Sequence, residues 1–75
     1  MLKNLKAEMI RNSITGEQIA RTINVNPATF SAKITEKSQF TWSEVKTIRD
    51  VYFPKCNLEY LFMPESESDK LALRN

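Results

Sequence analysis

Apolar residues recur at helical spacing at the start of the chain. Leu2, Leu5 and Met9, with Ile10 beside them, follow the spacing of one helix face. Charged residues stand between them, and we expect these on the opposite, solvated side: Lys3, Lys6, Glu8 and Arg11. The pattern therefore predicts a helix over residues 2–11, ended by Asn12 and Ser13.

A second helix is predicted by a capping signal followed by apolar positions. Thr15 stands three residues before Gln18, which is the spacing of a capping box, and an apolar stripe of Ile19, Ala20 and Ile23 follows. The second helix is therefore expected from about Gly16 to Ile23.

The next four residues indicate a tight turn. Asn24 follows the last periodic residue and tolerates a left-handed backbone better than other residues with a side chain. Asn26 is a favourable N-cap and Pro27 suits the first helical position. We expect a third helix from Pro27 to about residue 34 or 35, with Phe30 and Ile34 facing inward.

The same signals recur further along the chain. Thr41 and Glu44 have capping-box spacing, and Pro54 ends a helix predicted over 42–52. Its inward face is expected to carry Trp42, Val45, Ile48 and Tyr52. A short fifth helix capped by Asn57 is expected to bury some of Leu58, Leu61 and Phe62. Residues 64–75 have the polar composition of a flexible C-terminal tail.

Composition supports a single small domain. The chain has 75 residues, 41% of them apolar and 27% charged, and only one glycine and three prolines interrupt it. We therefore predict an all-α fold, a compact bundle of about five short helices over residues 1–63.

Several function classes are excluded by what the chain lacks. It has no histidine and one cysteine, Cys56, so we expect no metal site, no disulfide and no cofactor. Acidic residues are scattered rather than paired, and Glu44 is foremost a capping residue, so an enzyme is not expected. No segment approaches the roughly 20 apolar residues of a membrane span, and we expect a soluble cytoplasmic protein with no membrane partner.

The charge is mildly basic and unevenly placed. Net charge is +2, and residues 1–63 hold nine Lys and Arg against six Asp and Glu. A basic excess of this size permits a nucleic-acid partner without requiring one.

One segment resembles a known family. TGEQIARTINVNPATFS, Thr15 to Ser31, is similar to the helix-turn-helix of Cro and phage repressors, matching its pattern at Thr15, Ala20, Ile23, Val25, Thr29, Phe30 and Ser31. The resemblance extends over about residues 2–63. It implies a lambda-repressor-like domain that regulates transcription from operator DNA in a bacterial host cell, with the third helix in the major groove.

The resemblance also indicates candidate contact residues. The third helix and its flanks would supply base or partner contacts from Asn26, Pro27, Ala28, Thr29, Ser31, Ala32 and Lys33, and phosphate contacts from Arg21 and Lys37. The chain departs from the family pattern at Asn24, where glycine is usual, and at Gly16, where glutamine is usual. Strong bidentate base readers are absent from the third helix.

Two further interpretations stay open. The small, uncharged face of the third helix also suits a protein partner, as in a modulator or antirepressor that masks the DNA-binding surface of a repressor. A homodimer is expected for the DNA-binding function, and the end of the domain offers candidate interface residues: Leu58, Tyr60, Leu61 and Phe62.

Overall fold

The computed structural model describes residues 1–64, and these form five helices without a strand. The helices are α1 (Lys3–Arg11), α2 (Gly16–Thr22), α3 (Pro27–Ile34), α4 (Trp42–Tyr52) and α5 (Leu58–Leu61). The all-α fold and the five-helix count are therefore confirmed for this part of the chain. The tail predicted over 64–75 lies, apart from Pro64, outside the described residues.

The helix starts follow from the local capping signals. The Thr15 hydroxyl accepts a hydrogen bond from the Gln18 amide at 3.1 Å, and the Thr41 hydroxyl accepts one from the Glu44 amide at 3.1 Å. The side chains of Gln18 and Glu44 in turn accept hydrogen bonds from the backbone amides of Thr15 and Thr41. Asn57 caps α5 by accepting the Glu59 amide at 2.7 Å. Both predicted capping boxes are confirmed, and each fixes a helix start through contacts within one turn.

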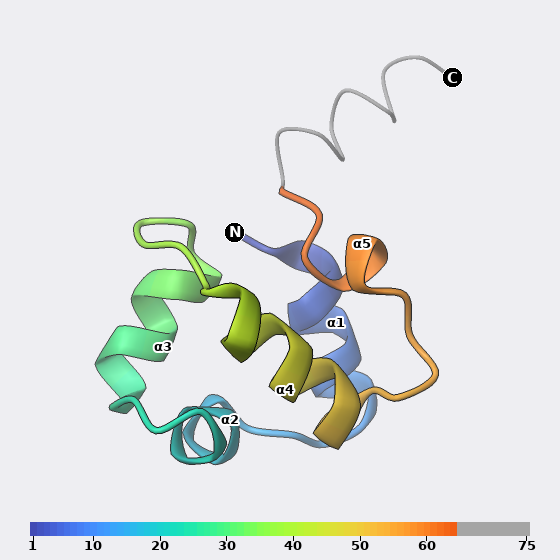
Figure 1. Cartoon of the computed structure of the whole chain (residues 1–75), viewed down its shortest axis with the longest axis horizontal. Coiled ribbons are helices and arrows are strands. Elements are labelled where there is room, and N and C mark those ends of the chain that lie inside the picture. Colours follow the sequence, from blue (N-terminus) through green and yellow to red (C-terminus); the bar gives the residue numbers. More distant parts are fainter. Residues whose placement is uncertain (65–75) are drawn as a thin grey trace.

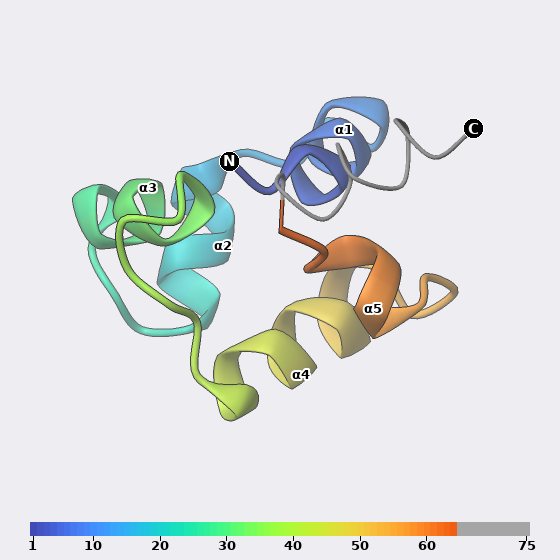
Figure 2. The ribbon, with the colours of Figure 1, turned by 90° about the horizontal axis from the view of Figure 1, so that it is seen from above.

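The helices enclose one core. Figure 1 shows α4 in front of α1, with α3 and α5 on opposite sides, and Figure 2 shows α1 and α4 on opposite sides of the molecule with α2 and α5 between them. Every helix contributes at least one buried apolar side chain. The core residues are Leu2, Leu5, Met9, Ile19, Ala20, Phe30, Ile34, Ile48, Phe53 and Leu61.

Side-chain hydrogen bonds join two pairs of helices. The Tyr52 hydroxyl on α4 donates to the Gln18 carbonyl on α2 at 3.1 Å and lies 2.6 Å from the Thr22 hydroxyl. On the other side of the domain, Asn4 on α1 donates to the Tyr60 carbonyl of α5 at 2.8 Å. These contacts fix α4 against α2 and α5 against α1.

Three expectations about which residues face inward were wrong. Trp42 is 68% exposed, because six helical residues of about 100° each place it roughly 120° from the buried Ile48. Ile10 is 70% exposed, beyond the edge of the buried face of α1. Glu8 is buried, because Tyr60 donates to its Oε2 at 2.9 Å and the Arg11 guanidinium lies 2.6 Å from the same atom.

Candidate nucleic-acid interface

The turn between α2 and α3 is tightly defined. Asn24 has a φ of 63°, in the left-handed region, and the Val25 amide donates to the Ala20 carbonyl at 2.9 Å. The Asn24 amide also donates to the Arg21 carbonyl, at 3.3 Å, which completes a Schellman motif. The expectation that Asn24 adopts the left-handed backbone of a tight turn is confirmed.

Small residues on α2 let α3 approach closely. Ala20 is buried, and a Cβ added at Gly16 would lie only 3.0 Å from two ring carbons of the buried Phe30. A side chain at position 16 would therefore push against the α3 core residue. Packing against Phe30 therefore favours glycine, which has no Cβ, at position 16.

The outward side of α3 is small and uncharged. Asn26, Pro27, Ala28 and Ser31 are exposed, and the structure places Thr29 and Ala32 in half-buried positions beside them. The predicted residues of this face are thus adjacent, apart from Lys33. We call this surface the α3 face and define it as Asn26, Pro27, Ala28, Ser31 and Ala32.

Asn26 has only part of its hydrogen-bonding capacity left for a ligand. Its Oδ1 accepts the Thr29 amide at 2.8 Å, as expected for the N-cap of α3. The carboxamide NH₂ group remains free to donate. Asn26 therefore offers a free donor at the α3 face, together with an oxygen that already accepts one hydrogen bond from the helix.

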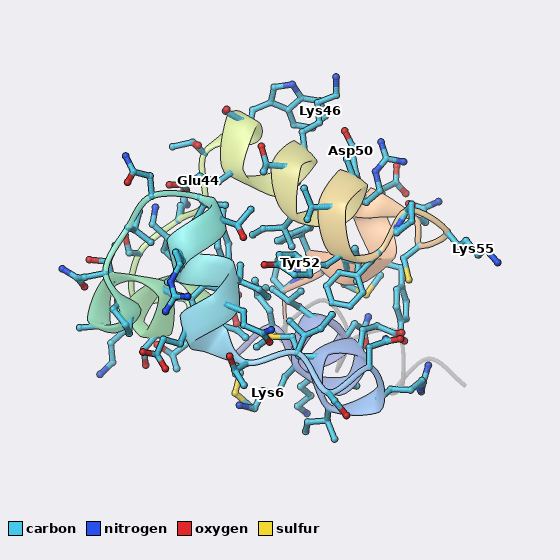
Figure 3. All side chains as sticks on the ribbon, turned by 90° about the horizontal axis from the view of Figure 1, so that it is seen from below. Lys6, Glu44, Lys46, Asp50, Tyr52 and Lys55 are labelled. Atoms are coloured by element: carbon cyan, nitrogen blue, oxygen red, sulfur yellow. The ribbon has the colours of Figure 1, made fainter. Side chains whose placement is uncertain are left out.

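Lys33 does not extend outward from α3, which corrects its assignment as a residue that contacts DNA bases. Its residue is 8% exposed, and its Nζ donates to Glu44 Oε1 at 2.9 Å and to the Gln39 carbonyl at 3.0 Å. The ammonium also lies 5.8 Å from the centroid of the Phe40 ring. The long side chain therefore crosses from α3 to the start of α4, whose Glu44 is labelled in Figure 3.

The Glu44 carboxylate is held in its charged form by this arrangement. Burial by itself raises the pKa of Glu44, but the hydrogen bonds from the Thr41 amide and the Lys33 ammonium lower it by more. The net result is a pKa below the ordinary value. Two cations remain exposed next to the α3 face in sequence, Arg21 in the last turn of α2 and Lys37 after α3.

The four candidate interface residues near the end of the domain lie in different environments. Leu61 is fully buried in the core, and the Phe62 ring packs edge-on against Phe40 with centroids 5.4 Å apart. Tyr60 donates to Glu8, and this bond, followed by burial, raises the pKa of the Tyr60 hydroxyl. Leu58 lines one outward depression and Phe62 lines a different one, so the set does not form one surface.

The sequence pattern did not identify two side chains that line the depression at Leu58, the exposed Trp42 and the half-buried Arg49. Trp42 and Arg49 share one side of α4, being seven residues apart, and both line the depression together with Asn57, Leu58 and Glu59. The labelled Lys46 and Asp50 in Figure 3 project from the same outer side of α4, whereas Tyr52 points inward. Spacing could have indicated Trp42, because it does not share a face with Ile48.

Residues 1–64 contain no group of three or more His, Cys, Asp or Glu side chains placed to hold a metal ion. No helix among these residues is both long enough and apolar enough to cross a membrane. Comparison with models of protein families, with curated proteins and with solved structures gives no match to this chain.

Proposed function

We propose that this protein is a helix-turn-helix regulator that binds operator DNA through the α3 face. The observation that carries the proposal is the pairing of a tight α2–α3 turn with an exposed, uncharged α3 face. Small side chains let a helix approach base edges closely, and Pro27, Ala28 and Ala32 can contact the methyl groups of thymine. Asn26 and Ser31 add hydrogen-bonding groups at the same surface.

Charge around α3 favours a polyanionic ligand. Residues 18–35 contain no Asp or Glu, so no carboxylate of this segment would repel a phosphate. The exposed Arg21 and Lys37 stand before and after α3 and are suited to phosphate contacts, which position a protein on DNA without reading its sequence.

A second candidate function is favoured by the position of Lys33. Since its ammonium is engaged with Glu44, the α3 face carries no charge of its own. Such a face suits a protein partner, and the candidate is a modulator that covers the DNA-binding surface of a repressor.

The test measures binding of the full chain to DNA flanking its own gene. Fluorescence anisotropy at several salt concentrations reports the binding, and a random duplex is the control. A regulator should prefer its site by about a thousandfold or more. Ala28→Glu, which adds a carboxylate at the α3 face, should abolish the preference. Weak binding that is equal for both duplexes would reject DNA reading and favour the protein-partner function, tested next by mixing the chain with the repressor of the neighbouring gene.

A further inference from the structure

A hollow of about 310 Å³ opens beside the loop that joins α3 to α4. Five apolar side chains form much of its wall: Leu2, Phe40, Val45, Phe62 and Pro64. All of them except Leu2 are only half-buried, so apolar surface in the hollow stays in contact with water. An apolar cavity of about 150 Å³ already holds a benzene molecule, so this hollow has room for two aliphatic side chains. Filling it would stabilise the protein by removing that surface from water.

The chain leaves the described part of the structure at this hollow. Pro64 belongs to the wall and is also the last described residue. Residues 65–75 follow it in the sequence, and their apolar members stand together as Leu71, Ala72 and Leu73, after the polar stretch 65–70. That stretch spans at most about 20 Å when fully extended, which is long enough for the chain to turn back to the hollow. The apolar residues that follow the domain are therefore within reach of it.

The spacing of the two leucines matches the wall of the hollow. Residues two apart point to the same side of an extended backbone, so Leu71 and Leu73 are able to enter one hollow together. The rings of Phe40 and Phe62 pack edge-on with centroids 5.4 Å apart, and they form a continuous apolar surface for the two side chains.

The charges on the two sides are complementary. Within the hollow, the Lys33 ammonium is neutralised by Glu44, to which it lies at 2.9 Å. Glu36 also lines the hollow, and its side chain is 33% exposed although it pairs with the N-terminal ammonium. The two leucines are flanked by cations, Lys70 and Arg74, whose charge is opposite to that of Glu36. A carboxylate accepts several hydrogen bonds, so Glu36 has capacity for one of them.

Covalent attachment favours this segment over a separate partner. A short linker holds the tethered group near its site at an effective concentration on the order of millimolar. A free protein at micromolar concentration would need roughly a thousandfold higher affinity to compete. The occupant for which the hollow is best placed is thus the chain's own segment.

We infer that residues 71–73 of this chain bind in the hollow, with Leu71 and Leu73 packed against Phe40 and Phe62. The bound segment joins the end of the domain to the loop between α3 and α4. Since Lys33 lines the same hollow, the segment also covers the ion pair that ties α3 to α4. No residue of the α3 face lines the hollow, so this inference is independent of the proposed function.

The direct test is nuclear magnetic resonance of the full chain labelled with ¹³C and ¹⁵N. Nuclear Overhauser effects are expected between the methyl protons of Leu71 or Leu73 and the ring protons of Phe40 and Phe62. Their absence would overturn the inference. A mixture of labelled and unlabelled chains then separates contacts within one chain from contacts between two. Contacts that arise only between chains would also overturn it, because the segment would then occupy the hollow of another molecule.

Substitution of the two leucines makes the test specific. A full chain with Leu71→Ser and Leu73→Ser should show changed amide chemical shifts at residues 38–40 and 45, because its segment no longer fills the hollow. Its equilibrium constant for unfolding, from urea denaturation, should rise about tenfold, since less apolar surface is buried. The matched control carries Ser66→Ala and Ser68→Ala in the same stretch of chain, and it should change neither quantity.

The pattern of shift changes locates the bound segment. Changes confined to the wall of the hollow would support the inference. Amide shifts that stay the same in the leucine variant, or that change only at residues away from the hollow, would overturn it. Circular dichroism of both variants should match that of the parent chain, because none of the substituted residues belongs to α1–α5.

Discussion

The ammonium group of Lys33 lies 2.9 Å from the carboxylate of Glu44, and this ion pair joins α3 to the first turn of α4. Glu44 also accepts the Thr41 amide at 2.9 Å, so the same oxygen completes the capping box of α4. Lys33 therefore holds the end of the candidate recognition helix in place and does not extend from it. Its contribution is expected in stability and in the orientation of α3.

Removing the Lys33 charge should destabilise the fold. Lys33→Met keeps most of the aliphatic stem but leaves the mostly buried Glu44 carboxylate without its cation. We expect the free energy of unfolding to fall by about 1–3 kcal/mol, as measured by urea denaturation. Lys46→Met, at an exposed position of α4, is the control and should cost less than about 0.5 kcal/mol. Equal midpoints for Lys33→Met and the parent chain would contradict a structural role for the ion pair.

The lowered pKa of Glu44 predicts a loss of stability in acid. A folded pKa below the ordinary value of 4.5 means that the unfolded chain binds the proton more tightly. The contribution of Glu44 is thus fully present above about pH 4.5 and is lost as the pH falls through the folded value. Urea denaturation at several pH values should show that the free energy of unfolding falls less steeply with decreasing pH for Glu44→Gln than for the parent chain. Parallel declines would mean that other carboxylates cause the acid sensitivity.

Local signals in the sequence predicted the helix starts well, and long-range contacts explain what they missed. The caps at Thr15, Asn26 and Thr41 act within one turn, so the pattern alone contains them. The direction of Lys33 depends on Glu44, eleven residues later, and on the folding back of the intervening loop. No local rule distinguishes that inward path from an outward one for a long, flexible side chain.

Two helix ends also lacked their usual signal. Ser13 and Glu36 have φ values of 56° and 68°, and each follows its helix with the hydrogen bonds of a Schellman motif. Glycine or asparagine would have indicated these left-handed positions, but serine and glutamate do not. The helix ends at residues 11 and 34 were nevertheless predicted, because the apolar periodicity stops there.

Strain at Ser13 should be removable. Ser13→Gly eliminates the Cβ that disfavours the left-handed backbone, and we expect the free energy of unfolding to rise by about 0.5–1 kcal/mol. Ser13→Ala is the matched control, because it loses the hydroxyl but keeps the Cβ and should give no gain. Thermal denaturation of the three chains measures the difference. A Ser13→Gly chain no more stable than Ser13→Ala would show that the turn stores no relievable strain.

Arg21 and Lys37 should control the salt dependence of DNA binding. Under the proposed DNA-binding function, Arg21→Ala and Lys37→Ala are each expected to reduce the slope of log affinity against log salt concentration by about one, since each removes one of the proposed phosphate contacts. Anisotropy titrations at four or more salt concentrations give the slope. Lys33→Met should leave it unchanged, because its ammonium faces Glu44. A slope that falls for Lys33→Met but not for Arg21→Ala and Lys37→Ala would place the DNA on a different surface.

Asn26 allows helix capping and DNA contact to be separated. Its Oδ1 caps α3 through the Thr29 amide, and only its NH₂ group is left to donate to a ligand. Aspartate is as good an N-cap as asparagine, and its negative charge interacts favourably with the positive end of the helix dipole. Asn26→Asp should therefore leave the melting temperature unchanged or raise it slightly. It removes the donor and adds a negative charge at the α3 face, so affinity for the preferred DNA should fall at least about tenfold. Asn26→Ser keeps a cap without the charge and should lose less affinity than Asn26→Asp. If all three chains bind DNA equally, Asn26 lies outside the interface and the α3 face cannot be the surface that meets the bases.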